Sequence, residues 1–314
     1  MKTTTTVILS ICSALIFITS GSPSLTAQQL HANATRETFP VGEHPQGLAF
    51  DGANIWVMCE GSKVFELAKD GTLLGTFPPG KGSYFGAFDG TNLWVTINGL
   101  NHGVTKVRTT DGRILGSVRL GSEPWGIVFD GTAIWVTDTY DGTVTKIRSR
   151  NGEVLDRFRI GTLPFAAAFD GANVWVTSGG GGNSSSVTKL RASDGAKLGV
   201  FPTGLEPVGV LFDGANIWTA NWFDGTLSKL RASDGALLGT FPAGSTANYI
   251  AFDGTKLWVT NFTPNTVTVL RQSDGGIENI YAVGQEPVGI VFDGTSMWVS
   301  NYLDATVSKI TPSN

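Results

Sequence analysis

The sequence predicts an all-β protein, a seven-bladed β-propeller with four antiparallel strands in each blade. An eight-residue motif, first seen as FDGANIWV at Phe50–Val57, occurs seven times, and successive motif aspartates lie 38 to 43 residues apart. No segment of the repeat region shows helical periodicity. A period near forty residues without a helix is typical of a propeller blade. The motif aspartates, one for each of blades 1 to 7, are Asp51, Asp89, Asp130, Asp170, Asp213, Asp253 and Asp293.

One repeat, Leu205 to Gly244, divides into four short runs: PVGVLFDG, ANIWTAN, FDGTLSKLRASDG and ALLGTFPAG. The Asp-Gly pairs between these runs indicate hairpin turns, in which we expect positive φ at both turn positions. The first two runs are almost continuously apolar, as in strands that are covered on both faces. We therefore expect the motif tryptophans to pack between blades; they are Trp56, Trp94, Trp135, Trp175, Trp218, Trp258 and Trp298.

The two ends of the repeat region predict how the ring closes. A copy of the fourth strand, ETFPVG at Glu37–Gly42, precedes the first motif, and the last repeat stops after its third strand with TVSKITPSN. We expect the N-terminal strand to complete the C-terminal blade, which removes the exposed sheet edge of an open array. The predicted propeller spans residues 37–314.

The N-terminal region reads as an export signal. Lys2 supplies a positive charge, and Val7–Ile18 is an apolar run that is too short to span a bilayer. A cleavage site after Ala27 gives a signal peptide at residues 1–27 and a linker at residues 28–36. We expect a secreted or periplasmic protein, with no membrane span after the signal is cleaved.

Composition and the absence of certain motifs exclude several classes of function. The formal net charge of −4 gives no basic footprint, so we expect no nucleic-acid partner. Cleavage of the signal removes Cys12 and leaves Cys59 alone, so no disulfide forms within the chain. No P-loop, HExxH, GxSxG or EF-hand spacing is present. We predict a monomer without a cofactor.

Aromatic residues outside the motif gather in two sets of connections. In a propeller, the connection from strand four to the next strand one and the connection from strand two to strand three lie on the same face, here called the top face. Clusters of exposed aromatic side chains mark recognition surfaces for a small molecule or a protein. The alternative is that some of these side chains cap the central channel. The candidates are Tyr84, Phe85, Trp125, Tyr140, Phe165, Trp222, Phe223, Tyr249, Phe262 and Tyr302.

Acidic residues occupy the same connections. Glu123, Glu206 and Glu286 take one repeat position, directly before a proline, in blades 3, 5 and 7. They form a potential ring of carboxylates that suits a cation or an amine, and they leave room for a divalent metal at the channel mouth. The alternative is that each carboxylate caps a backbone amide in its turn.

Four residues form the one constellation that resembles a catalytic site: His44, Cys59, Glu60 and His102. A thiolate with a nearby imidazole is a plausible nucleophile pair. The alternative is a buried and inert Cys59.

The segments WVTN at Trp258–Asn261 and WVSN at Trp298–Asn301 resemble the YVTN/NHL class of bacterial propeller repeats. A seven-bladed enzyme of similar build is virginiamycin B (streptogramin) lyase, a metal-assisted enzyme. Its glutamates often follow a WFT-type strand and its histidines often follow the loop proline, positions that hold other residues here. Two functions follow: an exported propeller that binds a ligand on its top face, or a lyase-like enzyme acting on a small secondary metabolite with His44, Glu60 and His102.

Overall fold

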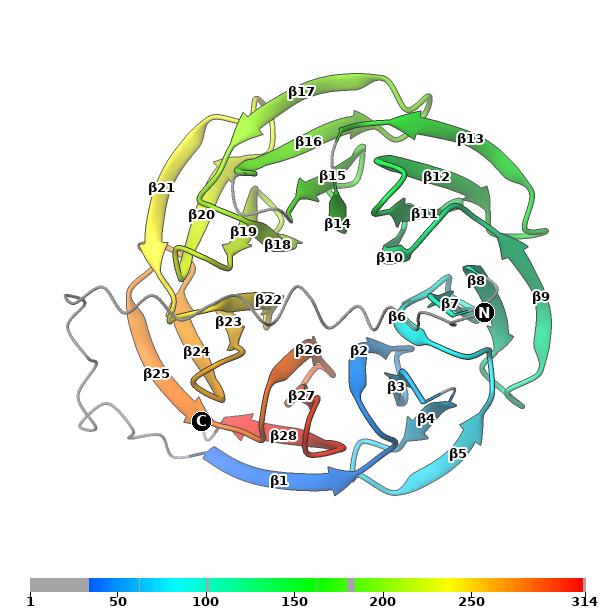
Figure 1. Ribbon diagram of the computed structural model, residues 1–314. Coiled ribbons are helices and arrows are strands. Elements are labelled where there is room, and N and C mark those ends of the chain that lie inside the picture. Colours follow the sequence, from blue (N-terminus) through cyan, green and yellow to red (C-terminus); the bar gives the residue numbers. More distant parts are fainter. Residues whose placement is uncertain (1–33, 62, 100–101, 162, 180–183, 313–314) are drawn as a thin grey trace, which may run out of the picture.

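The protein forms a closed ring of seven blades, which confirms the predicted fold (Figure 1). A computed structural model describes residues 34–61, 63–99, 102–161, 163–179 and 184–312. The predicted signal peptide and the start of the predicted linker lie outside the described residues. Each blade is a four-stranded antiparallel sheet. Within the described ranges, no helix has the length and apolarity needed to cross a membrane.

The strands occupy four concentric positions. The innermost are β2 (Pro45–Phe50), β6 (Ser83–Phe88), β10 (Pro124–Phe129), β14 (Pro164–Phe169), β18 (Pro207–Phe212), β22 (Ala247–Phe252) and β26 (Pro287–Phe292). The second strands are β3 (Ile55–Cys59), β7 (Asn92–Ile97), β11 (Ala133–Asp138), β15 (Asn173–Ser178), β19 (Asn216–Asn221), β23 (Lys256–Asn261) and β27 (Met297–Asn301). The third strands are β4 (Lys63–Leu67), β8 (Gly103–Arg108), β12 (Thr143–Arg148), β16 (Ser186–Arg191), β20 (Thr226–Arg231), β24 (Thr266–Arg271) and β28 (Thr306–Pro312). The outermost are β5 (Leu73–Phe77), β9 (Ile114–Arg119), β13 (Val154–Arg159), β17 (Lys197–Pro202), β21 (Leu237–Pro242), β25 (Ile277–Ala282) and β1 (Ala34–Pro40).

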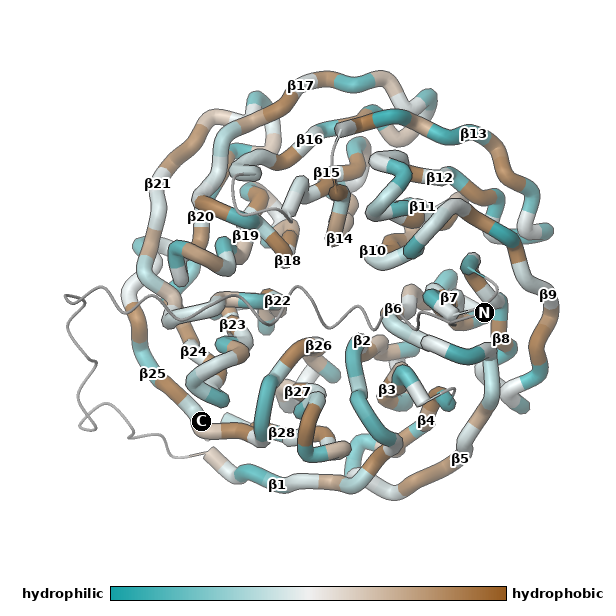
Figure 2. Tube along the Cα trace, in the orientation of Figure 1, coloured by the Kyte–Doolittle hydropathy of each residue, from teal (hydrophilic) through white to brown (hydrophobic). Residues whose placement is uncertain are grey.

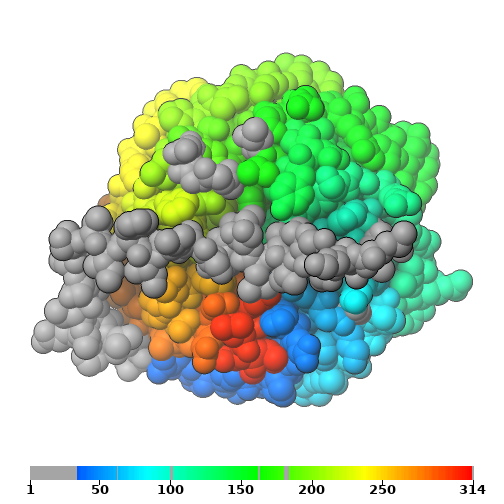
Figure 3. Space-filling view, viewed as in Figure 1, coloured from blue at the N-terminus to red at the C-terminus, as the bar shows by residue number. Residues whose placement is uncertain are grey.

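The N-terminal strand closes the ring, as the sequence predicts. β1 pairs antiparallel with β28, from Ala34 opposite Pro312 to Pro40 opposite Thr306. Figure 3 shows the blue start of the described chain beside the red C-terminal blade. The strand begins three residues before Glu37, so residues 34–36 belong to blade 7 rather than to the predicted linker.

Each motif aspartate holds the tryptophan that follows it five residues later. The indole Nε1 donates a hydrogen bond to the aspartate Oδ2 in all seven blades, at 2.6–2.8 Å. In blade 1, Asp51 Oδ1 also accepts from the backbone amides of Ala53 and Asn54. Only Gly52 has positive φ in this turn, so the expectation of positive φ at both positions is wrong. The Asp51 side chain accepts a hydrogen bond from the Asn54 amide, which in an ordinary hairpin donates to a backbone carbonyl.

The tryptophans pack between blades, as expected, and each is at most 2% exposed. Trp135 of blade 3 lies in one core cluster with Val174 and Val176 of blade 4. Phe158 of the outermost strand stacks on the indole, with ring centroids 5.4 Å apart. Lys146 lies over the same ring and donates to a backbone carbonyl of blade 4. These contacts make the ring a continuous scaffold.

A second-strand hydroxyl joins the innermost strands of neighbouring blades. The register of β10 against β11 shifts between Pro124 and Ile127, which opens the ladder there. Thr137 Oγ1 fills the gap, accepting from Gly126 N at 2.7 Å and donating to the Phe165 carbonyl of blade 4 at 2.6 Å. Thr96, Thr177 and Thr260 make the same contacts in blades 2, 4 and 6, and Ser300 makes them in blade 7, so a hydroxyl at this position fixes the channel end of five innermost strands, where the candidate site lies.

Candidate functional site

The top face is built on seven equivalent residues, here called the belt residues, that precede the innermost strands. Each has positive φ, and each backbone carbonyl accepts a hydrogen bond from an amide at the start of the connection between strands two and three in the same blade. Six of the seven are not glycine. Left-handed backbone at non-glycine residues is uncommon and gathers at functional sites. The belt residues are His44, Gly82, Glu123, Leu163, Glu206, Thr246 and Glu286.

Blades 3, 5 and 7 each combine a belt glutamate with an aromatic residue of the neighbouring loop; we call this pair an acid–aromatic unit. In blade 5, Trp222 N donates to Glu206 O at 2.9 Å, and in blade 7, Tyr302 N donates to Glu286 O at 3.1 Å. In blade 3 the donor is Thr139, directly before Tyr140, at 3.1 Å. The three units are Glu123 with Tyr140, Glu206 with Trp222, and Glu286 with Tyr302.

The glutamate of blade 3 is the best defined. Glu123 is only 3% exposed, and its Oε1 accepts from Asn98 Nδ2 at 3.2 Å. Its Oε2 is buried and has no hydrogen-bond partner of normal geometry among the described residues. Burial raises the pKa of this carboxyl, while the Asn98 amide and the nearby Tyr140 hydroxyl oppose the rise. A buried acceptor of this kind favours a donor supplied from outside.

The other two belt glutamates differ in exposure. Glu206 is 4% exposed, whereas Glu286 is only partly buried. Burial raises the pKa of Glu286, and the neighbouring His44 opposes that rise. In all three blades the belt carbonyl accepts the backbone hydrogen bond that closes the turn.

Five of the predicted aromatic residues fill the mouth of the central channel and are here called the plug: Tyr84, Phe85, Trp125, Phe165 and Tyr249. Trp125 lies 4.9 Å from Tyr84 and 5.3 Å from Phe165 between ring centroids, and its Nε1 donates to the Tyr249 hydroxyl at 3.0 Å. Phe85 of blade 2 meets Tyr249 of blade 6 at 4.9 Å. Because these residues come from blades across the ring, they close the channel, as the channel-cap alternative predicts. Burial raises the pKa of both tyrosines.

Small residues in alternate blades make room for the plug. The third residue of the innermost strand is glycine in blades 1, 3, 5 and 7, but Phe85 in blade 2 and Tyr249 in blade 6. A β-carbon on Gly47 would lie 2.7 Å from Phe85 Cδ1 and 2.7 Å from the Tyr84 carbonyl oxygen. At Gly126, Gly209 and Gly289 the clash would be with backbone atoms alone, so glycine at this position is required by the close approach of the neighbouring innermost strand.

The remaining predicted aromatic residues form a rim around the plug: Tyr140, Trp222, Phe223, Phe262 and Tyr302. Tyr140 is 53% exposed and Phe223 is 52% exposed. Trp222 packs on Phe262 of blade 6, with centroids 5.1 Å apart. The rim exposes apolar side chains to solvent, whereas the aromatic rings of the plug pack against one another.

The structure brings two of the four catalytic candidates together. His44 Nδ1 lies 3.9 Å from Glu60 Oε2, and its ring stacks on Tyr302 at 4.6 Å. Gln46 Nε2 donates to Glu60 Oε1 at 2.6 Å, and the Tyr302 hydroxyl donates to Oε2 at 3.3 Å. Gln46 was not among the candidates predicted from the sequence. The signal that could have identified it was its position directly after the loop proline, which recurs in the repeat.

Cys59 and His102 have other surroundings. Cys59 is fully buried in the core between blades 7 and 1, and burial raises the pKa of its thiol to about 12. His102 Nδ1 is 3.1 Å from Asn98 Oδ1, in blade 2. A thiol with this pKa is not a nucleophile near neutral pH, so the proposed Cys–His pair has no support in this geometry.

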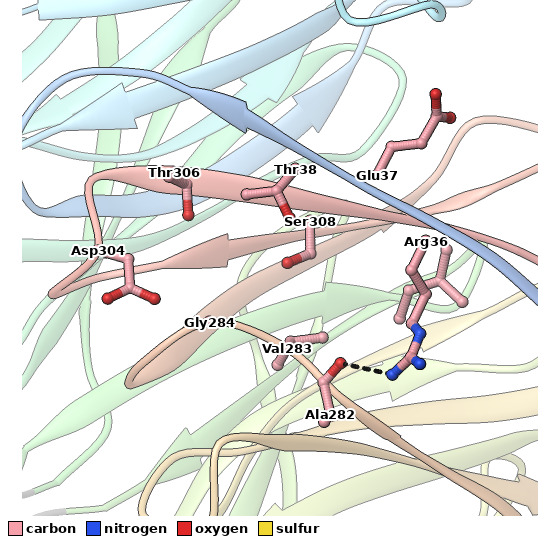
Figure 4. A pocket seen from close by; sticks show the side chains of 10 residues that line it. Arg36, Glu37, Thr38, Ala282, Val283, Gly284, Asp304, Thr306 and Ser308 are labelled. Carbon is pink, nitrogen blue, oxygen red and sulfur yellow. Dashed lines mark hydrogen bonds between the residues drawn. The ribbon is translucent and has the colours of Figure 1, made fainter.

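A cleft of about 640 Å³ lies apart from the predicted site, at the closing seam between blades 6 and 7 (Figure 4). Arg36 stands at one end and donates to the Ala282 carbonyl, and Asp304 stands at the other. The hydroxyls of Thr306 and Ser308 between them accept from Asn301 Nδ2. The same ladder recurs in blades 5 and 6, so these hydroxyls belong to the scaffold.

Metal chemistry of the lyase type does not fit the described residues. Among them, no group of three or more histidine, cysteine, aspartate and glutamate side chains is placed to hold a metal ion. The His44–Glu60 pair supplies two such groups.

The fold and the top face define the class of protein, a seven-bladed β-propeller of repeated FDG–Trp blades. Comparison of the sequence with models of known families gives no match, and comparison with curated protein sequences gives no match. The likeness to YVTN/NHL repeats consequently depends on the repeat motif alone.

Proposed function

We propose that this protein is an exported binding protein that recognises a positively charged ligand on its top face. The three acid–aromatic units carry this proposal. A carboxylate beside an aromatic ring suits an ammonium or guanidinium group, which gains an ion pair and a cation–π contact together. Units in blades 3, 5 and 7 are separated by single blades, so the arrangement favours a ligand with several cationic groups, such as a polyamine or a basic peptide.

The charge of the top face supports the same ligand class. The connections on this face hold eight carboxylates and one lysine, Lys81, and Asp138 at the end of β11 adds a ninth carboxylate, in a chain of net charge −4. A surface with one dominant sign of charge raises the local concentration of oppositely charged ligands. The carboxylates are Glu43, Glu60, Glu123, Asp138, Asp141, Glu206, Asp224, Glu286 and Asp304.

Preorganisation adds to the proposal. The left-handed backbone of the belt glutamates and the backbone bond to the aromatic loop hold the backbones of the two residues in place before a ligand arrives. Burial of Glu123 and Glu206 strengthens their interaction with a cation, because the local dielectric is lower than in water. The lyase-like alternative has weaker support, since the Cys–His pair is not assembled and the histidines lie in different blades.

The binding test uses spermine and isothermal titration calorimetry. The variant that replaces Glu123, Glu206 and Glu286 by glutamine keeps side-chain size and removes the three charges. We expect it to weaken spermine binding at least about tenfold, on the scale of charge-assisted contacts. Glu43→Gln removes an exposed acid of the same face outside the units; it is the matched control and should weaken binding much less than the triple variant, because it lowers only the overall charge of the face. Equal affinity of the triple variant and the wild type would remove the proposal.

Export is a separate part of the proposal and has its own test. The chain expressed from a secreting bacterial host should be recovered outside the cytoplasm with Gln28 as its first residue, because the predicted signal ends at Ala27. Recovery of a cytoplasmic chain that keeps residues 1–27 would contradict this expectation.

A further inference from the structure

Two neighbouring blades depart from the repeat in the same way on the outer wall. The fourth strand reads TFPPG, VFPTG and TFPAG in blades 1, 4 and 5, but SVRLG in blade 2 and RFRIG in blade 3. Arg119 and Arg159 thus stand where blades 1, 4 and 5 have proline. Packing does not demand this change, because both arginines are exposed while the preceding Val118 and Phe158 face the core.

The departure creates a cluster of unpaired positive charge. Five arginines on β9 and β13 or in the turns that precede these strands are exposed, and none forms an ion pair with any residue that the structure describes. Their neighbours Arg108 and Arg148 are already paired, with Asp111 and Glu153. The five arginines are Arg113, Arg119, Arg150, Arg157 and Arg159.

The same two strands expose aliphatic side chains. Ile114 and Leu115 are 46% and 44% exposed, and Val154 and Leu155 are 39% and 37% exposed. β9 and β13 are neighbours on the outer wall of the ring (Figure 1), and hydrophobic and hydrophilic residues alternate along them (Figure 2). We call these four residues and the five arginines the basic–aliphatic sector. A sector of this sign in a chain of net charge −4 calls for an anionic partner.

We infer that the basic–aliphatic sector docks on an anionic phospholipid surface. Aliphatic side chains enter the boundary between headgroups and acyl chains, while guanidinium groups bind the lipid phosphates. The sector contributes no exposed aromatic ring for stacking on bases, because Phe158 packs on Trp135, and this disfavours a single-stranded nucleic acid. Its small apolar area and few charges fit weak, reversible attachment.

Membrane docking through the basic–aliphatic sector is compatible with ligand binding on the top face but does not depend on it. The sector lies on the side wall of blades 2 and 3, whereas the acid–aromatic units lie on the top face. Docking by the wall leaves the top face accessible. Loss of spermine binding therefore leaves the membrane test unaffected, and the two proposals fail separately.

The test is co-sedimentation with vesicles of phosphatidylcholine that do or do not contain phosphatidylglycerol. The wild type should bind the anionic vesicles, and added salt should release it because the attraction is screened. The variant Arg119→Gln, Arg157→Thr and Arg159→Gln should partition at least about tenfold less, on the scale of single basic residues near such a surface. Arg157→Thr supplies the residue of blade 5 at this position, Thr240.

The matched control lies in blade 5. Leu237 and Leu238 are 47% and 43% exposed, like Ile114 and Leu115, but β21 carries no charge. Leu237→Ser with Leu238→Ser should leave partition unchanged, whereas Ile114→Ser with Leu115→Ser should reduce it. Thermal melting shows that every variant is folded. The inference is overturned if the wild type binds neutral and anionic vesicles equally, if the arginine variant partitions as the wild type does, or if the blade 5 control loses binding to the same extent.

Discussion

The plug and the rim use the same residue types on the same face for different purposes. Plug residues begin the innermost strands, close to the channel axis, where their rings meet rings from other blades. Rim residues lie in the connections between strands two and three, farther from the axis, where Tyr140 and Phe223 stay half exposed. An aromatic residue in a propeller loop therefore gains its role from the strand position it follows, and its identity alone does not reveal that role.

The first prediction concerns the packing of the plug and has the largest expected effect. Trp125→Ala removes the ring that contacts Tyr84, Phe85 and Phe165 and leaves a void in the plug. We expect the free energy of unfolding to fall by about 3 kcal/mol, as for other large-to-small changes in packed sites. Urea unfolding followed by circular dichroism measures it. In the rim, Trp222→Ala should cost about 1 kcal/mol or less, and equal losses at the two sites would show that plug and rim do not differ.

A smaller effect is expected when only the hydrogen bond inside the plug is removed. Tyr249→Phe keeps the ring but leaves the Trp125 indole N–H without its 3.0 Å acceptor. An unsatisfied donor in a partly buried site costs about 1–2 kcal/mol. Thermal denaturation of the two proteins gives the difference, and an unchanged melting temperature would mean that water satisfies the indole.

The next prediction sharpens the comparison at the base of the blade 3 rim loop. Asp138 is fully buried, its Oδ2 accepts from Thr145 and its Oδ1 has no partner among the described residues, whereas blades 5 and 7 carry Asn221 and Asn301 here. Burial raises the pKa of Asp138, and the Thr145 hydroxyl only partly opposes this. Because the pKa of Asp138 is higher in the folded state than in the unfolded state, the folded protein holds the protonated carboxyl at little cost. The free energy of unfolding therefore falls as the pH rises through the folded-state pKa.

Asp138→Asn should therefore stabilise the protein at neutral pH by about 1 kcal/mol, since an amide here can donate to the hydroxyls of Thr143 and Thr145, which both contact Asp138, without a charge. The gain should shrink as the pH falls and vanish below the unfolded-state pKa of about 3.9. Urea unfolding at several pH values measures this. A gain that does not depend on pH would mean that Asp138 is not a titrating buried acid.

The repeat made most of the fold predictable. Seven motifs at a near-constant spacing defined the blades, and the isolated copy of strand four at Glu37 predicted the closing strand. The extension of that strand back to Ala34 escaped prediction because residues 34–36 do not resemble the repeat. They join the sheet because β28 runs one residue past the usual end of a third strand, to Pro312, and pairs with them without the register shift of the other blades.

The site was predictable in its location but not in its division into plug and rim. All ten aromatic candidates lie on the top face or at the channel mouth, but which rings reach the axis depends on glycine at the third position of alternate innermost strands. The Asp51–Trp56 hydrogen bond was visible only as a constant spacing of five residues, since a β-turn had to fold the two side chains together. His44 and Glu60 meet because the belt carbonyl of His44 binds the Glu60 amide, a contact that has no signature in a single sequence.

The central claim is that a belt glutamate and its loop aromatic act together as one cation site. A calorimetric double-mutant cycle on blade 5 tests it most directly, with spermine titrated into the wild type, Glu206→Gln, Trp222→Ala and the double variant. We expect each single change to weaken binding and the double variant to lose less than the sum of the two losses, with a coupling of about 1 kcal/mol between the two side chains. Strictly additive losses, or single variants that bind as the wild type does, would contradict it.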